Sequence, residues 1–299
     1  MGEGGIAVLV NPRAGRGRHR GLLPGVLEAL GRSGRPVRVL TADDGAGAED
    51  ACRQAVAEGV GAIVSVGGDG TVHRALQAVA GSEVPLGVVP AGTGNDFASA
   101  VGVPGEGLAA AEAISRALRD GRDGRVDLAK VVTCDGTVRW FGAVLAAGFD
   151  AIVNERANAM RWPRGPRRYD LAIALELARL RTRRYDLVLD GVEHSFDGVL
   201  VAIGNGHSYG GGMRICPAAD PRDGMLDVVI GGDLGRAALT RLKPRLRRGT
   251  HVGDPEVTAF RAREVRVGAE GIVGYADGER VAALPLTVSC EKGAVRLLI

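Results

Sequence analysis

The chain has 299 residues, of which 45% are hydrophobic and 24% charged, a near-average globular composition that predicts one large domain or two ordinary ones. The 38 basic and 35 acidic residues give a formal net charge of +3, too even a balance to suggest a nucleic-acid partner, and we expect none. The four cysteines lie far apart without a C-x-x-C pair, which argues against a zinc site or a disulfide framework. No segment approaches the roughly 18 apolar residues of a membrane span. We therefore expect a cytoplasmic protein that is at most peripheral to a membrane.

Short apolar runs alternate with amphipathic stretches through residues 1–127. The runs at residues 6–10, 37–40, 62–66 and 86–89 are largely aliphatic, as parallel strands buried on both faces should be. Helix-like stretches follow at residues 21–30, 48–58, 72–80 and 108–118. This alternation predicts a doubly wound α/β domain, in which ligands bind at the carboxyl ends of the strands.

The pattern changes after residue 127. Strand-like runs at residues 137–147, 185–190 and 198–203 follow one another, with helical stretches predicted at 169–184 and 234–247. Asp-Gly pairs, which favour type I′ hairpin turns, punctuate this part of the chain. They begin at Asp135, Asp190, Asp197, Asp223 and Asp277. We therefore expect a second domain that is rich in antiparallel strands.

The segment Val-Ser-Val-Gly-Gly-Asp-Gly-Thr-Val at residues 64–72 runs from a strand through a glycine-rich turn into a helix. Glycines lack the Cβ atoms that block close approach, so backbone N–H groups at a helix N-terminus can converge on phosphate oxygens. The segment matches neither a Walker A loop nor G-x-G-x-x-G. The alternative interpretation is a tight turn that binds no ligand.

Two further glycine-rich turns, at residues 10–17 and 90–97, follow the first and fourth predicted strands. Each by itself is an ordinary loop. Because parallel strands end at the same edge of a sheet, three such turns together predict a crevice lined by amide donors and Thr hydroxyls.

The motifs N-P-x-x-G, G-G-D-G-T and P-x-G-T-x-N-D-F occur in this order, and the chain thereby resembles the catalytic domain of the diacylglycerol kinase-like lipid kinases, including bacterial members related to sphingosine kinases. The resemblance continues nearly to the end of the chain. Its later segments are Gly148-Phe149-Asp150-Ala151, Gly204-Asn205, Tyr209-Gly210-Gly211-Gly212-Met213, residues 217–227 and Ala276-Asp277-Gly278-Glu279. G-G-D-G-T is shared with NAD kinases, so the later segments are what distinguish the two groups.

The resemblance implies both the fold and the domain boundaries. Residues 1–127, with a return strand in residues 286–299, would form the α/β nucleotide-binding catalytic domain. Residues 128–285 would form a β-rich antiparallel sandwich that binds the lipid.

The resemblance also implies which residues bind the nucleotide and the metal. The nucleotide site would include Asn11, Thr41, Gly67, Gly68, Gly70, Thr71 and Thr93. Asp69, and less directly Asp96, would hold catalytic Mg²⁺ together with ATP phosphates, because Mg²⁺ prefers oxygen ligands. A second, structural metal would be held by the Asp223 carboxylate and the backbone carbonyls of Asp220 and Met225. An Asp-rich turn without a metal is the alternative.

By the same resemblance the D-G-E segment supplies the general base, either Asp277 or Glu279, which accepts the proton of the attacking hydroxyl. A plain hairpin turn is the alternative for this segment. The implied reaction is transfer of the γ-phosphate of ATP to diacylglycerol, giving phosphatidic acid. Phosphatidylglycerol, a sphingoid base and an isoprenoid alcohol are alternative acceptors, and an NAD kinase or a nucleotide-binding regulator without turnover are alternative functions.

A lipid acceptor requires contact with a membrane surface. The segment 161–168 places Trp162 among arginines, and residues 241–248 form a second basic cluster. Both are suited to anionic headgroups. Solvated loops in an Arg-rich chain are the alternative, and a homodimer is compatible with the sequence.

Overall fold

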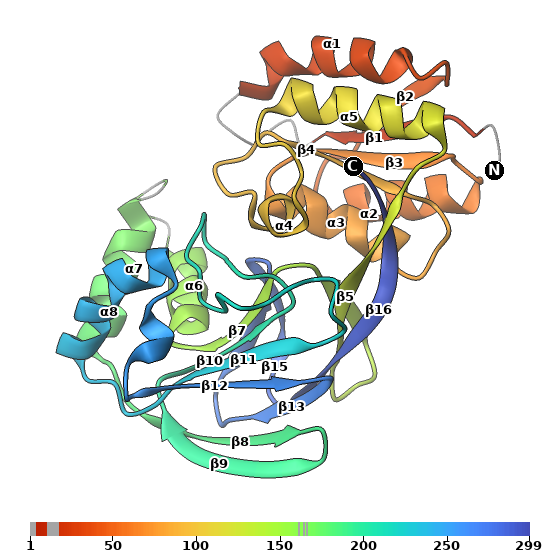
Figure 1. Cartoon of the computed structure of the whole chain (residues 1–299). Coiled ribbons are helices and arrows are strands. Elements are labelled where there is room, and N and C mark those ends of the chain that lie inside the picture. The colour runs from red at the N-terminus through yellow and green to blue at the C-terminus, as the bar shows by residue number, and fades with distance from the viewer. Residues whose placement is uncertain (1–3, 11–17, 161, 164, 166) are drawn as a thin grey trace. The chain divides into compact units, whose positions relative to one another are not determined.

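The computed structural model describes residues 4–10, 18–160, 162, 163, 165 and 167–299 (Figure 1). The chain divides into two compact units. Unit 1 contains Met1–Leu128, Pro221–Gly224 and Glu291–Ile299, and unit 2 contains Ala129–Asp220 and Met225–Cys290.

Unit 1 is built on parallel strands in the order β2-β1-β3-β4. Their bounds are β1 Ile6–Val10, β2 Val37–Leu40, β3 Ala62–Gly67 and β4 Leu86–Pro90. The end of β16 (Leu286–Leu298) also pairs in parallel with β4, through Leu297 and Leu86. All of these strands therefore end at one edge of the sheet.

Helices cover both faces of this sheet (Figure 1). On one face lie α1 (Arg18–Gly31) and α5 (Gly107–Asp120), and on the other lie α2 (Gly45–Ala57) and α3 (Asp69–Val79). The short α4 (Asp96–Val101) follows β4. Leu30 of α1 and Ile114 of α5 pack with Val8 and Val64 of the strands in one core cluster. This arrangement confirms the predicted doubly wound α/β layer.

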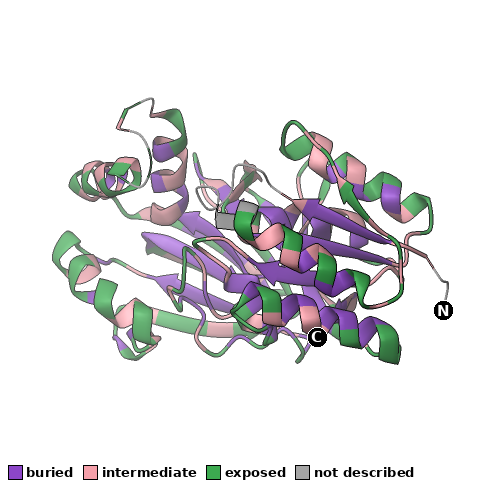
Figure 2. Ribbon diagram, turned by 90° about the horizontal axis from the view of Figure 1, so that it is seen from above, coloured by how far each residue is buried: buried purple, intermediate pink, exposed green. Residues whose placement is uncertain are grey.

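Strand β2 departs from the prediction that every strand of unit 1 is buried on both faces. Arg38 and Val39 are exposed, Val39 by 42%. The reason is the position of β2 at the edge of the sheet, where β1 is its partner on one side. Figure 2 shows the strands inside the sheet as buried.

Unit 2 contains antiparallel strands in two sheets within the described residues. The first sheet has the order β12-β11-β10-β7-β14-β15. In the second sheet, β13 pairs with β8 on one side and with the first part of β16 on the other. Strand β9 pairs with β8, and β5 pairs with β6. The bounds in the first sheet are β7 Val144–Gly148, β10 Leu200–Gly204, β11 Leu226–Gly231, β12 Val257–Ala262, β14 Val273–Ala276 and β15 Glu279–Ala283. Those in the second are β5 Gly124–Val132, β6 Val138–Phe141, β8 Arg183–Leu189, β9 Val192–Gly198 and β13 Glu264–Gly268.

The core of unit 2 lies between the two sheets. Leu145 and Val201 of the first sheet pack in one cluster with Leu187 and Val265 of the second, as expected for a β-sandwich. Helices α6 (Phe149–Ala159), α7 (Arg167–Ala178) and α8 (Arg236–Arg248) and the 3₁₀ turn His251–Gly253 complete the unit. The predicted antiparallel sandwich is confirmed.

Several local predictions for unit 2 were wrong. The single strand predicted at residues 137–147 is two strands, β6 and β7, which break at Gly142 and Ala143 and belong to different sheets. The helix predicted at 169–184 ends at Ala178. The last two residues of the predicted range, Arg183 and Arg184, belong to β8 instead. Helix α6 was not predicted, since its sequence FDAIVNERANA has only a weakly apolar face.

The Asp-Gly pairs also behave differently from one another. Asp190 and Asp277 have positive φ values of 47° and 51°, and each lies in a hairpin turn as predicted. Asp197 lies inside β9 instead, and Asp223 lies in the Pro221–Gly224 segment of unit 1. Among the described residues, no helix has both the length and the apolar character to cross a bilayer.

Candidate active site

The turns that follow β3 and β4 pack directly against each other. The backbone N–H of Ala91 donates to the Gly67 carbonyl at 2.9 Å. A Cβ atom on Gly92 would lie 2.4 Å from the Cα of Gly68, a separation that real Cβ atoms do not adopt. Two of the three glycine-rich turns found in the sequence therefore meet at the carboxyl edge of the unit 1 sheet, and glycine is what allows their backbones to touch.

Gly67 must also be glycine, for a separate reason. A Cβ atom there would lie 2.2 Å from Oγ1 of Thr71, because the first turn of α3 folds back over the end of β3. Thr71 is 5% exposed, and its backbone N–H donates to the Gly68 carbonyl at 2.9 Å. The G-G-D-G-T segment thus forms a compact strand-to-helix turn with the N-terminus of α3 at its centre.

Two carboxylates begin the helices that follow these turns. Asp69 is the first residue of α3, and its Oδ1 accepts the backbone N–H of Phe97 at 3.3 Å. Asp96 is the first residue of α4 and is 5% exposed. Asn95 holds the second turn, since its Oδ1 accepts the N–H of Gly92 at 3.2 Å. The bond from Phe97 to Asp69 therefore joins the two acidic turns.

The other predicted nucleotide residues lie near the same edge of unit 1. Thr41 is exposed and follows β2 directly, and Thr93 is exposed in the turn after β4. Gly70 is exposed in the first turn of α3. Asn11 and the rest of the first glycine-rich turn lie outside the described residues.

Asp127 of unit 1 was not singled out from the sequence, yet it organises two separate segments. It is 4% exposed, and its Oδ2 accepts the N–H of Gly224 at 2.7 Å while its Oδ1 accepts the N–H of Gly293 at 2.7 Å. Its own N–H donates to the Pro221 carbonyl at 2.8 Å. The available signal was an acidic residue inside an otherwise apolar strand run, V-D-L-A-K-V-V.

In unit 2 the D-G-E segment forms the turn between β14 and β15. The carboxylate of Asp277 accepts backbone N–H groups from Gly142 at 2.9 Å, from Ala143 at 2.9 Å and from Val144 at 3.3 Å. A carboxylate offers about four lone-pair sites, so these three bonds use most of the capacity of Asp277. Glu279, the first residue of β15, is partly exposed beside this turn.

The Gly204-Asn205 motif meets the same loop. The side-chain amide of Asn205, which is fully buried, donates to the Gly142 carbonyl at 2.9 Å, and the backbone N–H groups of Asn205 and Gly206 donate to the Ala143 carbonyl. Residues 142 and 143 thus join the Gly204-Asn205 motif to the D-G-E turn. These backbone positions could not be identified from residue type.

A second polar contact joins two other motifs of unit 2. The Tyr209 hydroxyl donates to Oδ2 of Asp150, which links the Tyr-Gly-Gly-Gly-Met loop to the start of α6. Burial raises the pKa of the Asp150 carboxyl, and the hydrogen bond from Tyr209 partly offsets this rise. Burial likewise raises the pKa of Tyr209 well above its usual value.

The β14–β15 hairpin is also tied to α6. Oε1 of Glu155 accepts hydrogen bonds from the Tyr275 hydroxyl at 2.5 Å and from Nε–H of Arg280 at 2.9 Å. The hydrogen bond from Tyr275 and then the bond from Arg280 lower the pKa of Glu155. Tyr275 and Arg280 flank the D-G-E turn, so this contact fixes the hairpin on both sides of it.

No group of three or more His, Cys, Asp or Glu side chains in the described ranges is placed to hold a metal ion. The second metal predicted at Asp220, Asp223 and Met225 stays a prediction. Trp162 of the predicted membrane segment is 78% exposed, while Arg161, Arg164 and Pro166 lie outside the described residues.

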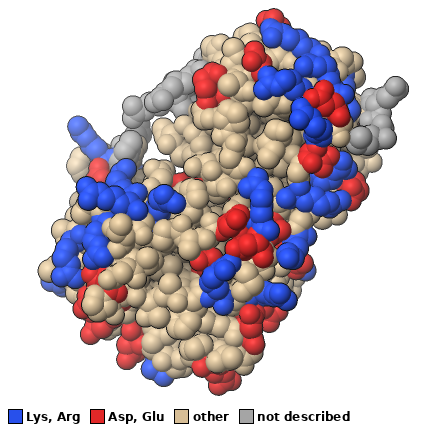
Figure 3. All heavy atoms as spheres, viewed as in Figure 1, with Lys and Arg blue, Asp and Glu red and all other residues tan. Residues whose placement is uncertain are grey.

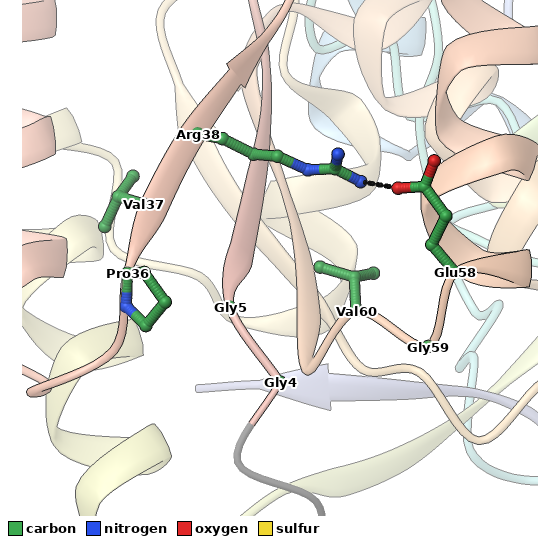
Figure 4. A pocket seen from close by; sticks show the side chains of 8 residues that line it. All are labelled: Gly4, Gly5, Pro36, Val37, Arg38, Glu58, Gly59 and Val60. Carbon is green, nitrogen blue, oxygen red and sulfur yellow. Dashed lines mark hydrogen bonds and ion pairs between the residues drawn. The ribbon is translucent and has the colours of Figure 1, made fainter.

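A hollow of about 330 Å³ lies at the opposite edge of unit 1 from the glycine turns (Figure 4). It is lined by Gly4, Gly5, Pro36, Val37, Arg38, Glu58, Gly59 and Val60, and an ion pair between Arg38 and Glu58 spans it. It contains none of the predicted site residues.

The chain matches two family models. Residues 5–131 match the diacylglycerol kinase catalytic domain, and residues 143–299 match the YegS C-terminal NAD kinase beta sandwich-like domain. The chain is 42% identical over 296 residues to a diacylglycerol kinase of Mycobacterium tuberculosis, covering 99% of this chain and 95% of that protein. It is 34% identical over 275 residues to a protein of Stenotrophomonas maltophilia named "Probable lipid kinase YegS-like", covering 87% and 85% of the two chains.

Solved structures share the fold. A diacylglycerol kinase from Bacillus anthracis matches 98% of this chain and 96% of its own, with a TM-score of 0.72 and 22% identity. An NAD kinase from Archaeoglobus fulgidus in complex with ATP matches 98% and 93% of the two chains, with a TM-score of 0.55 and 15% identity.

Proposed function

Because the chain belongs to the family of diacylglycerol kinases and YegS-like lipid kinases, we propose that it transfers the γ-phosphoryl group of ATP to the hydroxyl of diacylglycerol, giving phosphatidic acid. Membership of this family makes the protein a kinase with an alcohol acceptor. Diacylglycerol is the acceptor named for its 42% identical relative, and this is the support for choosing it among lipid hydroxyls.

The packed turns of unit 1 carry the nucleotide part of the proposal. They place the N-terminus of α3 beside backbone amides at the carboxyl edge of the parallel sheet, where phosphates bind in doubly wound folds. We assign the phosphates to Gly67, Gly68, Gly70 and Thr71, and the remaining nucleotide contacts to Asn11, Thr41 and Thr93.

Mg²⁺ fits the donors of these turns. The carboxylates of Asp69 and Asp96 are hard oxygen donors on adjoining turns, and Mg²⁺ in kinases needs only one or two carboxylates besides phosphates and water. When bound, the ion would neutralise charge on the phosphoryl group. In this assignment Asp69 is the main protein ligand and Asp96 the second.

For proton transfer we assign the acceptor to Glu279. The attacking hydroxyl must lose its proton as its oxygen bonds to phosphorus and ADP leaves, and a carboxylate is suited to accept it. Asp277 holds three backbone N–H groups, so its main task would be to fix the turn on which Glu279 stands.

The test is transfer of labelled γ-phosphate to diacylglycerol, phosphatidylglycerol, a sphingoid base, an isoprenoid alcohol and NAD. We expect diacylglycerol to be labelled fastest. The variant Asp69→Ala should transfer phosphate at least about 100-fold more slowly, because a metal ligand is lost. Asp120→Ala, which removes an exposed carboxylate of unit 1, is the matched control. Preferential labelling of NAD would replace this proposal with the NAD kinase alternative.

A further inference from the structure

Helix α8 (Arg236–Arg248) carries an unusual concentration of positive charge. Its 13 residues include five Arg and one Lys and no acidic residue. The whole chain has a net charge of only +3, so the remainder of the chain is net negative. The helix is therefore a local concentration of net positive charge, although most basic residues of the chain lie elsewhere.

The charge of α8 lies on the side turned away from the protein. Leu242 is 3% exposed and packs with Leu239, Leu246 and Ala238 into the apolar cluster of unit 2 that contains Leu200. The basic residues on the other side are exposed. They are Arg236, Arg241, Lys243, Arg247 and Arg248. The helix is thus amphipathic, with a cationic outer face.

Only part of this charge is neutralised within the protein. Asp254, 6% exposed, pairs with Arg245 at 2.9 Å and with Arg241 at 3.3 Å, and these contacts hold α8 in place. No ion pair between described residues involves Lys243, Arg247 or Arg248. Cations in the last turn of a helix interact favourably with the helix dipole. Arg236 and Lys243 lie outside that turn, so the dipole does not explain why these two positions are basic.

The basic surface continues onto the end of α7. A guanidinium nitrogen of Arg236 donates to the Ala178 carbonyl at 2.5 Å, and Leu180 packs in the same apolar cluster as Leu239. Arg179 and Arg181, on either side of Leu180, are exposed. Figure 3 shows Lys and Arg side chains gathered over α7 and α8. We call this set, Arg179, Arg181, Arg236, Lys243, Arg247 and Arg248, the α8 face.

We propose that the α8 face docks the protein onto an anionic lipid surface. This inference rests on the proposed function, since a lipid acceptor lies in a membrane and the kinase must remain there to reach it. A cationic helix face fits the negative surface potential of such a membrane, and each basic residue near it contributes about 1 kcal/mol, or roughly fivefold in partitioning.

The test compares Lys243→Gln/Arg247→Gln/Arg248→Gln with Arg116→Gln/Arg263→Gln/Arg266→Gln. The control removes the same charge from exposed positions elsewhere. Glutamine maintains helix propensity, and equal melting temperatures would show that both variants are folded. Binding is measured by sedimentation with vesicles of phosphatidylcholine alone or with phosphatidylglycerol, at low and high salt.

We expect the parent and the control to bind the phosphatidylglycerol vesicles and to dissociate at high salt. The α8 variant should bind on the order of 100-fold more weakly. Equal binding by the α8 variant and the parent would overturn the inference. It would also be overturned if the variant lost affinity for a double-stranded oligonucleotide while its vesicle binding was unchanged.

Activity in neutral detergent micelles separates this inference from the proposed function. All three proteins should phosphorylate diacylglycerol there at similar rates, because no anionic surface is present. If the parent transferred phosphate to no lipid in micelles, the proposed function would fail, while the vesicle measurement would still decide the role of the α8 face.

Discussion

Gly92 and Gly68 approach each other so closely that a single added carbon on Gly92 would lie 2.4 Å from the Cα of Gly68. This contact joins the two turns to which we assign the nucleotide phosphates. It therefore links a packing requirement to the proposed binding of phosphates.

The substitution Gly92→Ala should separate these turns. The added Cβ atom would clash with backbone atoms, which cannot move aside as a flexible side chain can, so we expect a loss of about 1–3 kcal/mol of stability. We also expect weaker binding of ATP, measured by calorimetry. Gly105→Ala is the matched control, since a Cβ atom there meets nothing within 4 Å. If folded Gly92→Ala bound ATP with unchanged affinity, the assignment of the phosphates to this pair of turns would be wrong.

The two acidic residues of the β14–β15 turn should behave differently. Glu279→Gln should lower kcat by about 10²–10⁴-fold, the range for a lost general base, with a melting temperature near that of the parent. Asp277→Asn can adopt the positive φ of 51° but loses charge-assisted bonds to backbone N–H groups, so it should cost about 1–3 kcal/mol of stability. If Glu279→Gln retains full kcat while Asp277→Asn abolishes it, the proton acceptor is Asp277.

Asp127→Ala should destabilise unit 1. It leaves the N–H groups of Gly224 and Gly293 without their carboxylate, and an unsatisfied buried N–H group costs about 1–3 kcal/mol. Chemical denaturation should show this loss. Asp120→Ala removes a surface carboxylate paired with Arg122 and should change the stability by less than about 1 kcal/mol. A similar small effect for both variants would contradict the role of Asp127.

The bonds of Glu155 predict a dependence on pH. Its pKa is lowered in the folded protein by Tyr275 and Arg280, so its carboxylate stabilises the fold above its unfolded-state pKa of about 4.3 and loses this contribution as the pH falls through the lower folded value. Glu155 is 41% exposed, so the effect at pH 7 should stay below about 1 kcal/mol. The melting temperature of Glu155→Gln should lie below that of the parent at pH 7 and approach it in acid. A difference that persists unchanged in acid would rule out ionisation as its cause.

Much of unit 1 could be predicted from local sequence, because its strands and helices are encoded by apolar periodicity. The runs at residues 6–10 and 37–40 match β1 and β2 residue for residue. The exposure of β2 could not be read from its residues, since a strand's neighbours in the sheet are decided by the order in which distant segments pair.

In unit 2 the turn at Asp277 and Gly278 was also predictable, because Asp-Gly tolerates two positive φ values. The break between β6 and β7 was not. It lies at Gly142, whose N–H donates to Asp277, 135 residues further along the chain.

The sequence by itself determined the glycine turns, the acidic residues and the cationic α8, because each depends on residue type and short-range spacing. Only the tertiary structure decided that the backbones of Gly68 and Gly92 touch. It also decided that the Asp127 carboxylate accepts the N–H groups of Gly224 and Gly293, and that the Asp277 carboxylate accepts N–H groups of a distant loop. The physical reason is that these hydrogen bonds and contacts join atoms brought together by sheet pairing and core packing. No local pattern specifies those atoms.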